Sequence, residues 1–142
     1  MKNLFLLASG LMLIFLSSCE NNDLLLSEKK LNSKIQKTWK IVSPSPDIDA
    51  HENWTFANGS LAIHFQKNGI DTTVVGAYSI DAKMTNAYVS LGSFGYINQI
   101  ASHWTAQELN RKWTIVELDN GIMYFSGVDD NGIIRSMEFV EK

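Results

Sequence analysis

Apolar and polar residues alternate along most of the chain after residue 38, with the two-residue period of a β-strand. In one such run Leu61, Ile63 and Phe65 fall on one face, opposite His64 and Gln66. Side chains that alternate in this way cover a core on one face and meet solvent on the other. The pattern predicts eight strands, over residues 38–43, 54–57, 61–66, 72–80, 87–91, 113–118, 122–127 and 133–140.

Asn-Gly dipeptides separate several of these strands. This dipeptide readily adopts the left-handed backbone of a type I′ turn, which joins two paired antiparallel strands. It occurs four times, each time between runs rich in β-forming residues, at residues 58–59, 68–69, 120–121 and 131–132. These turns predict two three-stranded meanders. An eight-stranded up-and-down antiparallel sheet closes into a barrel, because closure removes its exposed edges, so the predicted fold class is an all-β barrel.

Two places depart from the regular alternation. In the sixth strand the apolar side slips, so that Ile115 and Leu118 both face inward, and a β-bulge near Glu117 would explain the slip. In the last strand Arg135 falls on the apolar face, which is an unusual place for a charged residue.

A short helix is predicted before the first strand, within residues 24–36. Leu31 and Ile35 fall near one face of this helix and lysines fall largely elsewhere. Ser27 is the expected N-cap. The helix is expected to cover one end of the barrel.

Residues 92–111 form a segment that is too long and irregular for a hairpin. Thr105 and the glutamate three residues later fit a capping box, which predicts a single helical turn. The segment also carries Phe94, Tyr96 and Trp104. It is expected to be either a lid over a ligand entrance or a plug that fills one end of the barrel.

The N-terminal residues have the features of a bacterial export signal. Lys2 precedes an uncharged apolar run at residues 4–16, which is too short to span a bilayer but suits a signal-peptide core. The following Leu16-Ser17-Ser18-Cys19 resembles a lipobox, which implies transfer of a diacylglyceryl group to Cys19 and cleavage before it. The alternative is an ordinary secretory signal with an incidental cysteine.

This interpretation divides the chain into a signal peptide at residues 1–18, a lipidated tether at 19–23 and a barrel domain at 24–142. The mature protein is then expected in the cell envelope, where its lipid is expected to anchor it to the outer membrane. Cys19 is the single cysteine of the chain, so no disulfide is expected. Removal of Lys2 changes the formal charge from −3 to −4, and an acidic domain is a poor partner for nucleic acid.

Four short segments resemble the small lipocalin-like lipoproteins of Bacteroidetes. They are Lys37-Thr38-Trp39-Lys40, Trp54-Thr55-Phe56-Ala57-Asn58-Gly59-Ser60, Tyr78-Ser79-Ile80-Asp81 and Met137-Glu138-Phe139-Val140. The resemblance covers about residues 24–142. It implies that Trp39 packs under Arg135 to close the barrel through a cation–π contact, although Lys37 stands where the lipocalin motif has glycine.

No constellation of side chains in the sequence indicates catalysis. His51, His64 and His103 are scattered and lack the spacing of metal ligands. The run Asp129-Asp130-Asn131-Gly132 lacks the remaining ligands of an EF-hand and is expected to be a hairpin turn. The expectation is therefore a protein that is not an enzyme and has no metal site and no cofactor.

The resemblance to lipocalins implies a binding module for a small apolar or amphipathic ligand, with Trp104, Tyr96 and Phe94 as candidate contacts. The alternative is an accessory or inhibitor lipoprotein that binds another envelope protein through its loops. An eight-stranded barrel can hold a ligand or be filled by its own side chains. Large inward residues favour a filled or narrow interior: Trp54, Phe56, Phe65, Tyr78, Met137 and Phe139.

Overall fold

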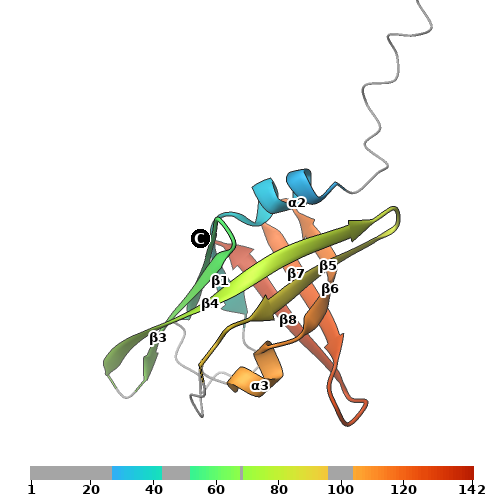
Figure 1. Ribbon diagram of the computed structural model, residues 1–142. Coiled ribbons are helices and arrows are strands. Elements are labelled where there is room, and N and C mark those ends of the chain that lie inside the picture. The colour runs from blue at the N-terminus through green and yellow to red at the C-terminus, as the bar shows by residue number, and fades with distance from the viewer. Residues whose placement is uncertain (1–26, 43–51, 68, 96–103) are drawn as a thin grey trace, which may run out of the picture.

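The computed structural model describes residues 27–42, 52–67, 69–95 and 104–142. Eight strands and two short helices make up this part of the chain (Figure 1). The helices are α2 (Glu28–Ile35) and α3 (Ala106–Leu109). The strands are β1 (Thr38–Val42), β2 (Asn53–Ala57), β3 (Ser60–Lys67), β4 (Ile70–Lys83), β5 (Asn86–Gly92), β6 (Lys112–Asp119), β7 (Ile122–Val128) and β8 (Ile134–Glu141).

The strands form a closed barrel in which each strand pairs with the next one along the chain. All the neighbours are antiparallel, and β8 returns to pair with β1 through Trp39 opposite Glu141 and Ile41 opposite Phe139. The predicted eight-stranded up-and-down barrel is therefore confirmed. Figure 1 shows α2 at one end of the barrel and α3 at the other.

Two of the four Asn-Gly turns have the predicted geometry. Asn58 and Asn120 have φ angles of 50° and 51°, and the glycines that follow have φ angles of 80° and 77°. These left-handed pairs join β2 to β3 and β6 to β7, and strand pairing begins directly beside each turn, with Ala57 opposite Ser60 and Asp119 opposite Ile122. In the third turn Gly69 has a φ of 76°, and Asn68 lies outside the described residues.

The fourth turn, between β7 and β8, is longer. The carboxylate of Asp129 accepts hydrogen bonds from the N–H groups of Asn131 and Ile133, both at 2.9 Å. Only Gly132 of this turn has a positive φ, of 79°. The Asp129 side chain thus accepts hydrogen bonds from backbone N–H groups of the turn. In a two-residue turn, the strand ladder would satisfy these groups. The prediction of a hairpin turn here is confirmed.

Both helices begin at the predicted caps. The Ser27 hydroxyl accepts a hydrogen bond from the Lys30 N–H at 3.1 Å, and Thr105 and Glu108 form a complete capping box. α2 buries Leu31 and Ile35 against its end of the barrel. The Tyr78 hydroxyl on β4 donates to the Asn32 Oδ1 atom at 2.9 Å, which ties the polar side of α2 to the barrel wall.

Aromatic side chains fill the interior. Trp54 meets Phe139 with 5.0 Å between ring centroids, and Phe125 meets Phe139 at 5.6 Å, both edge to face. This geometry is favourable for aromatic pairs. The fully buried side chains are Trp39, Trp54, Trp113, Phe56, Phe125, Phe139, Ile35, Leu61, Ile63, Leu109 and Met123. The six large residues expected to fill the interior are all buried: Trp54, Phe56, Phe65, Tyr78, Met137 and Phe139.

The predicted β-bulge in β6 is confirmed, because the register with β7 shifts between Ile115 and Glu117. The extra residue, Val116, turns outward and is 59% exposed. It lets Ile115 and Leu118 lie on the inner side of the wall, where Leu118 is buried.

The expected contact between Trp39 and Arg135 is wrong. Trp39 lies beside α2, where its Nε1 atom donates to the Ile35 carbonyl at 2.9 Å. Arg135 lies at the other end of β8, opposite Gly127. Its Nε atom is 3.1 Å from the Asp129 carboxylate, and its side chain is 44% exposed. The alternation does continue to Arg135, but the β7–β8 hairpin extends past the barrel end, where there is no interior to face.

Candidate functional site

Phe94 and Trp104, two of the three aromatic residues expected to contact a ligand, lie at the α3 end and contact the protein itself. Phe94 is buried, and its ring lies against Gly76 of β4, where an added Cβ would be 2.5 Å from the ring. Trp104 is half-buried and meets Trp113 edge to face at 5.6 Å. Tyr96 lies outside the described residues. Phe94 and Trp104 therefore pack as parts of a plug do.

Hydrogen bonds hold this plug in place. Asn110 Oδ1 accepts from the Phe94 N–H at 3.3 Å, and its Nδ2 atom donates to the Phe94 carbonyl at 3.4 Å. Leu109 of α3 is buried, and its carbonyl accepts from Trp113 Nε1 at 3.3 Å. The guanidinium carbon of Arg111 lies 5.8 Å from the centroid of the Trp113 ring, and its Nη1 atom donates a hydrogen bond to the Val128 carbonyl. These contacts tie the described parts of the 92–111 segment to the barrel.

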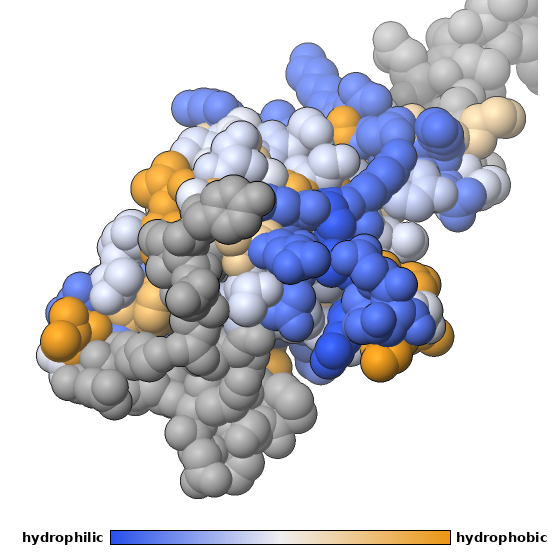
Figure 2. Space-filling view, turned by 60° about the horizontal axis from the view of Figure 1, so that its bottom comes forward, coloured by the Kyte–Doolittle hydropathy of each residue, from blue (hydrophilic) through white to orange (hydrophobic). Residues whose placement is uncertain are grey.

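The outer surface at the α3 end is mixed in character. Figure 2 shows hydrophilic side chains between separate small groups of hydrophobic ones on this face. The β7–β8 hairpin contributes three well-exposed apolar side chains, Val128, Ile133 and Ile134.

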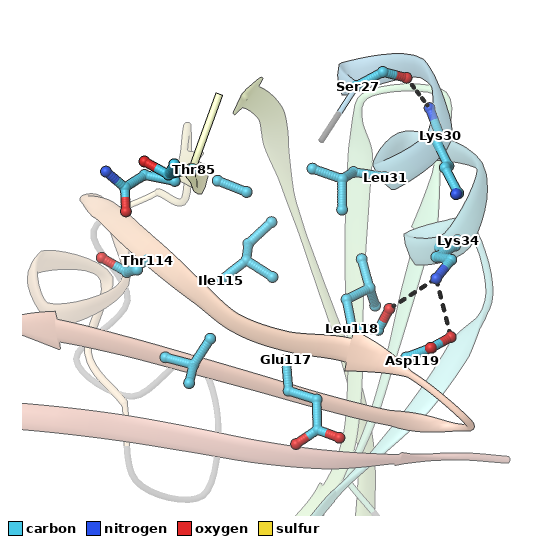
Figure 3. A pocket seen from close by; sticks show the side chains of 13 residues that line it. Ser27, Lys30, Leu31, Lys34, Thr85, Thr114, Ile115, Glu117, Leu118 and Asp119 are labelled. Carbon is cyan, nitrogen blue, oxygen red and sulfur yellow. Dashed lines mark hydrogen bonds and ion pairs between the residues drawn. The ribbon is translucent and has the colours of Figure 1, made fainter. Parts of the chain in front are cut away.

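A cleft of about 540 Å³ opens at the opposite end, between α2, the turn from β4 to β5, and β6 (Figure 3). Its volume is in the range of small-molecule sites. It is lined by Ser27, Lys30, Leu31, Lys34, Thr85, Asn86, Ala87, Thr114, Ile115, Val116, Glu117, Leu118 and Asp119.

The cleft exists because β5 and β6 separate. Their ladder runs from Ser90 opposite Lys112 to Tyr88 opposite Thr114 and then stops. Beyond this ladder β5 extends only back to Asn86, its first residue after the turn from β4. β6 continues through its bulge to Asp119. The barrel wall is therefore open beside the second half of β6, and α2 lies across part of the opening.

The inner surface of the cleft is apolar. Leu31 of α2 points toward Ile115 and Leu118 of β6 (Figure 3). Ala87 of β5 adds a fourth apolar side chain, and it is buried like Leu31 and Leu118. Four apolar side chains from three elements thus surround one small recess.

The rim carries both charges. Lys34 Nζ lies 2.9 Å from the Asp119 carboxylate and donates to the Leu118 carbonyl at 3.5 Å. The hydrogen bond from Lys34 is the main cause that lowers the pKa of Asp119 below its usual value. Lys30 also lines the cleft, while the carboxylate of Glu117 points away from Leu31 (Figure 3). The rim can therefore meet a polar or charged group beside an apolar one.

No group of three metal-ligating side chains occurs within residues 27–42, 52–67, 69–95 and 104–142. His64 is exposed and hydrogen-bonds the Thr73 hydroxyl at 3.0 Å, while His51 and His103 lie outside the described residues. In the same part of the chain, neither helix is long and apolar enough to cross a bilayer.

The expected ligand contacts Phe94 and Trp104 and the cleft lie at opposite ends of the described barrel. The slipped alternation at Ile115 and Leu118 is a sequence signal for this region, because bulges are frequent at sheet edges, at barrel rims and next to active sites. The sequence gives no such signal for Leu31 and Ala87, since their proximity to β6 depends on where α2 lies and on where β5 begins. Comparison of the chain with protein-family models, curated proteins and solved structures gave no significant match.

Proposed function

We propose that this protein is a lipid-anchored envelope protein that binds a small amphipathic ligand in the cleft between α2 and β6. The observation that carries the proposal is the cleft itself, which combines an apolar recess with a rim of both charges. A ligand with an apolar part and a polar part matches that division. Each methylene group buried in the recess would contribute about 0.8 kcal/mol to binding.

The filled interior supports this location over the barrel centre. Trp39, Trp54 and Trp113 are all fully buried among other core side chains. Interiors packed in this way leave few voids larger than a water molecule. A ligand of several carbon atoms would need a site outside this core, and the opening beside β6 is such a site.

The anchor would hold the cleft near a membrane. Ser27 lines the cleft and lies eight residues after Cys19. At about 3.5 Å per residue, a fully extended chain between them spans no more than about 28 Å. A lipid on Cys19 would thus keep the cleft within reach of amphiphiles that leave or enter the membrane surface.

Native mass spectrometry of the full mature protein, extracted from its own membranes in mild detergent, tests the ligand proposal. Ala87→Phe is expected to fill the cleft, whereas Ala62→Phe places the same ring on β3, away from it. A small-molecule adduct on the wild type and on Ala62→Phe, but not on Ala87→Phe, is the expected result. The proposal is wrong if no adduct is present, or if all three proteins carry the same adduct.

The anchor is tested separately, by feeding cells a clickable fatty-acid analogue. The wild type is expected to be labelled and Cys19→Ala to remain unlabelled. Equal labelling of the two proteins would contradict the anchor without bearing on the cleft.

A second candidate is an accessory lipoprotein that binds another envelope protein through its surface. The filled core favours it, and so does the exposed apolar tip of the β7–β8 hairpin, where Val128 and Ile134 are 61% and 73% exposed. Contiguous exposed apolar patches often mark protein–protein interaction sites. Under this function a protein partner co-purifies with the wild type and is lost from Ile134→Lys, while Ala87→Phe retains it.

A further inference from the structure

We infer that the ligand of the cleft is a short extended peptide segment that pairs with the open edge of β6. This inference rests on the proposed function and names its ligand class. It is based on the direction in which the backbone N–H and C=O groups of β6 point beside the cleft.

The ladder fixes which groups of β6 face β5. The Leu91 N–H donates to the Arg111 carbonyl at 2.9 Å. Backbone groups point to the same side at every second residue of a strand, so those of Trp113 and Ile115 also point toward β5. Ala87 is the residue that would lie opposite Ile115, but the pairing stops one step earlier. The Ile115 carbonyl and the Ala87 N–H are thus the first groups beyond the ladder.

The bulge extends this edge by one more residue. Glu117 is opposite Tyr124 of β7 and Asp119 is opposite Ile122. Leu118, between them, therefore directs its backbone groups away from β7 and toward the cleft. The contact from Lys34 Nζ to the Leu118 carbonyl shows this direction.

The open edge is short and lies beside the apolar recess. It is bounded by the last β5–β6 pair on one side and by Lys34 on the other. At about 3.3 Å per residue, the stretch from Ile115 to Leu118 accommodates about three residues of an added strand. A peptide there would direct one side chain between Leu31 and Leu118 and leave its neighbours at the charged rim.

Strand addition is a common way to bind peptides, because an exposed sheet edge supplies hydrogen bonds independently of sequence. A lipid-like amphiphile could fill the recess, but it would leave the Ile115 carbonyl and the Leu118 N–H without strand partners. A peptide satisfies both the edge and the recess, so it is the ligand class that the geometry favours.

The test starts from a random linear heptapeptide library displayed on phage and selected on the full mature protein in detergent micelles. The best peptide is synthesised with a fluorophore, and its affinity is measured by fluorescence polarisation. Each backbone nitrogen of the peptide is then methylated in turn. The expected result is a loss of about tenfold or more at alternate positions and of less than about threefold between them, as expected when single edge hydrogen bonds are removed.

Two protein variants give the location. Ala87→Phe is expected to weaken the peptide at least about tenfold, while Ala62→Phe leaves it unchanged, and both variants are first compared by thermal melting. A shallow methylation profile without alternation, an unaffected Ala87→Phe, or no selected peptide would each overturn the inference. If these results occur while the membrane-extracted protein still carries an adduct that Ala87→Phe lacks, the proposed function stands and its ligand is not a peptide.

Discussion

Gly76 is the position where a single methyl group most directly tests the closure of the α3 end. A Cβ atom added there would lie 2.5 and 2.6 Å from two atoms of the Phe94 ring and 2.7 Å from the Gly92 carbonyl oxygen. These distances are far below van der Waals contact, and the carbonyl belongs to β5, the strand paired with β4 at this point. Either the ring or the strand must move in Gly76→Ala.

The cost can be divided by a double-mutant cycle. Overpacking a well-packed site costs about 1–3 kcal/mol, and Gly76→Ala is expected at the upper end of that range because backbone is involved. Phe94→Ala alone is expected to cost about 3–5 kcal/mol through lost burial. In the Phe94→Ala background the ring clash is absent, so Gly76→Ala should cost at least about 1 kcal/mol less than in the wild type.

Urea unfolding of the four proteins, followed by tryptophan fluorescence, measures these differences. Gly92→Ser serves as a control, because nothing lies within 4 Å of a Cβ added at that position. Additive costs for Gly76→Ala and Phe94→Ala, within about 0.5 kcal/mol, would refute the packing of Phe94 on β4 and with it the plug.

Two further predictions concern the cleft rim and the turns. The pKa of Asp119 is lowered chiefly by Lys34, so this carboxylate adds stability above its ordinary pKa of 3.8, and the contribution is lost as pH falls through the lowered value. Urea unfolding should therefore show Asp119→Asn to be destabilised at pH 7 and equal to the wild type well below pH 3.8; an equal difference at both pH values contradicts the ion pair. Asn120→Ala places alanine at a φ of 51° and is expected to cost about 1 kcal/mol, whereas Asn131→Ala, without a positive φ, should cost less; the reverse order in thermal melting would contradict the turn assignment.

The barrel was accessible from the sequence because its signals are local. Alternation over a few residues identifies a strand, and Asn58-Gly59 or Asn120-Gly121 identifies the turn that pairs it with the next one. The caps at Ser27 and Thr105 are equally local, since each involves a donor three residues along the chain. The bulge in β6 was visible as a slip in the same alternation.

Arg135 shows where local signals stop. Alternation assigns each residue to one side of the sheet. It does not indicate whether that part of the strand still lies beside the barrel interior. β8 carries Met137 and Phe139 inside, and two residues earlier the same face is already solvent. The charged side chain then pairs with Asp129 of its own hairpin, which sequence alone could not distinguish from a pairing with Trp39.

The cleft was not accessible for a related reason. It depends on the difference between where β5 begins, at Asn86, and where β6 ends, at Asp119. That difference, together with the placement of Leu31 across the gap, is a property of the assembled barrel. The aromatic residues Phe94 and Trp104 gave the more visible pattern, but at this end they serve packing.

The most direct test of the cleft as the ligand site is photo-crosslinking in living cells. The photoreactive residue p-benzoyl-phenylalanine is introduced either at Asn86, which lines the cleft, or at Trp104, at the α3 end. After irradiation the protein is purified and its intact mass is measured. A discrete added mass is expected on the protein labelled at position 86 and none on the protein labelled at position 104. An added mass at position 104 alone would contradict the cleft as the ligand site.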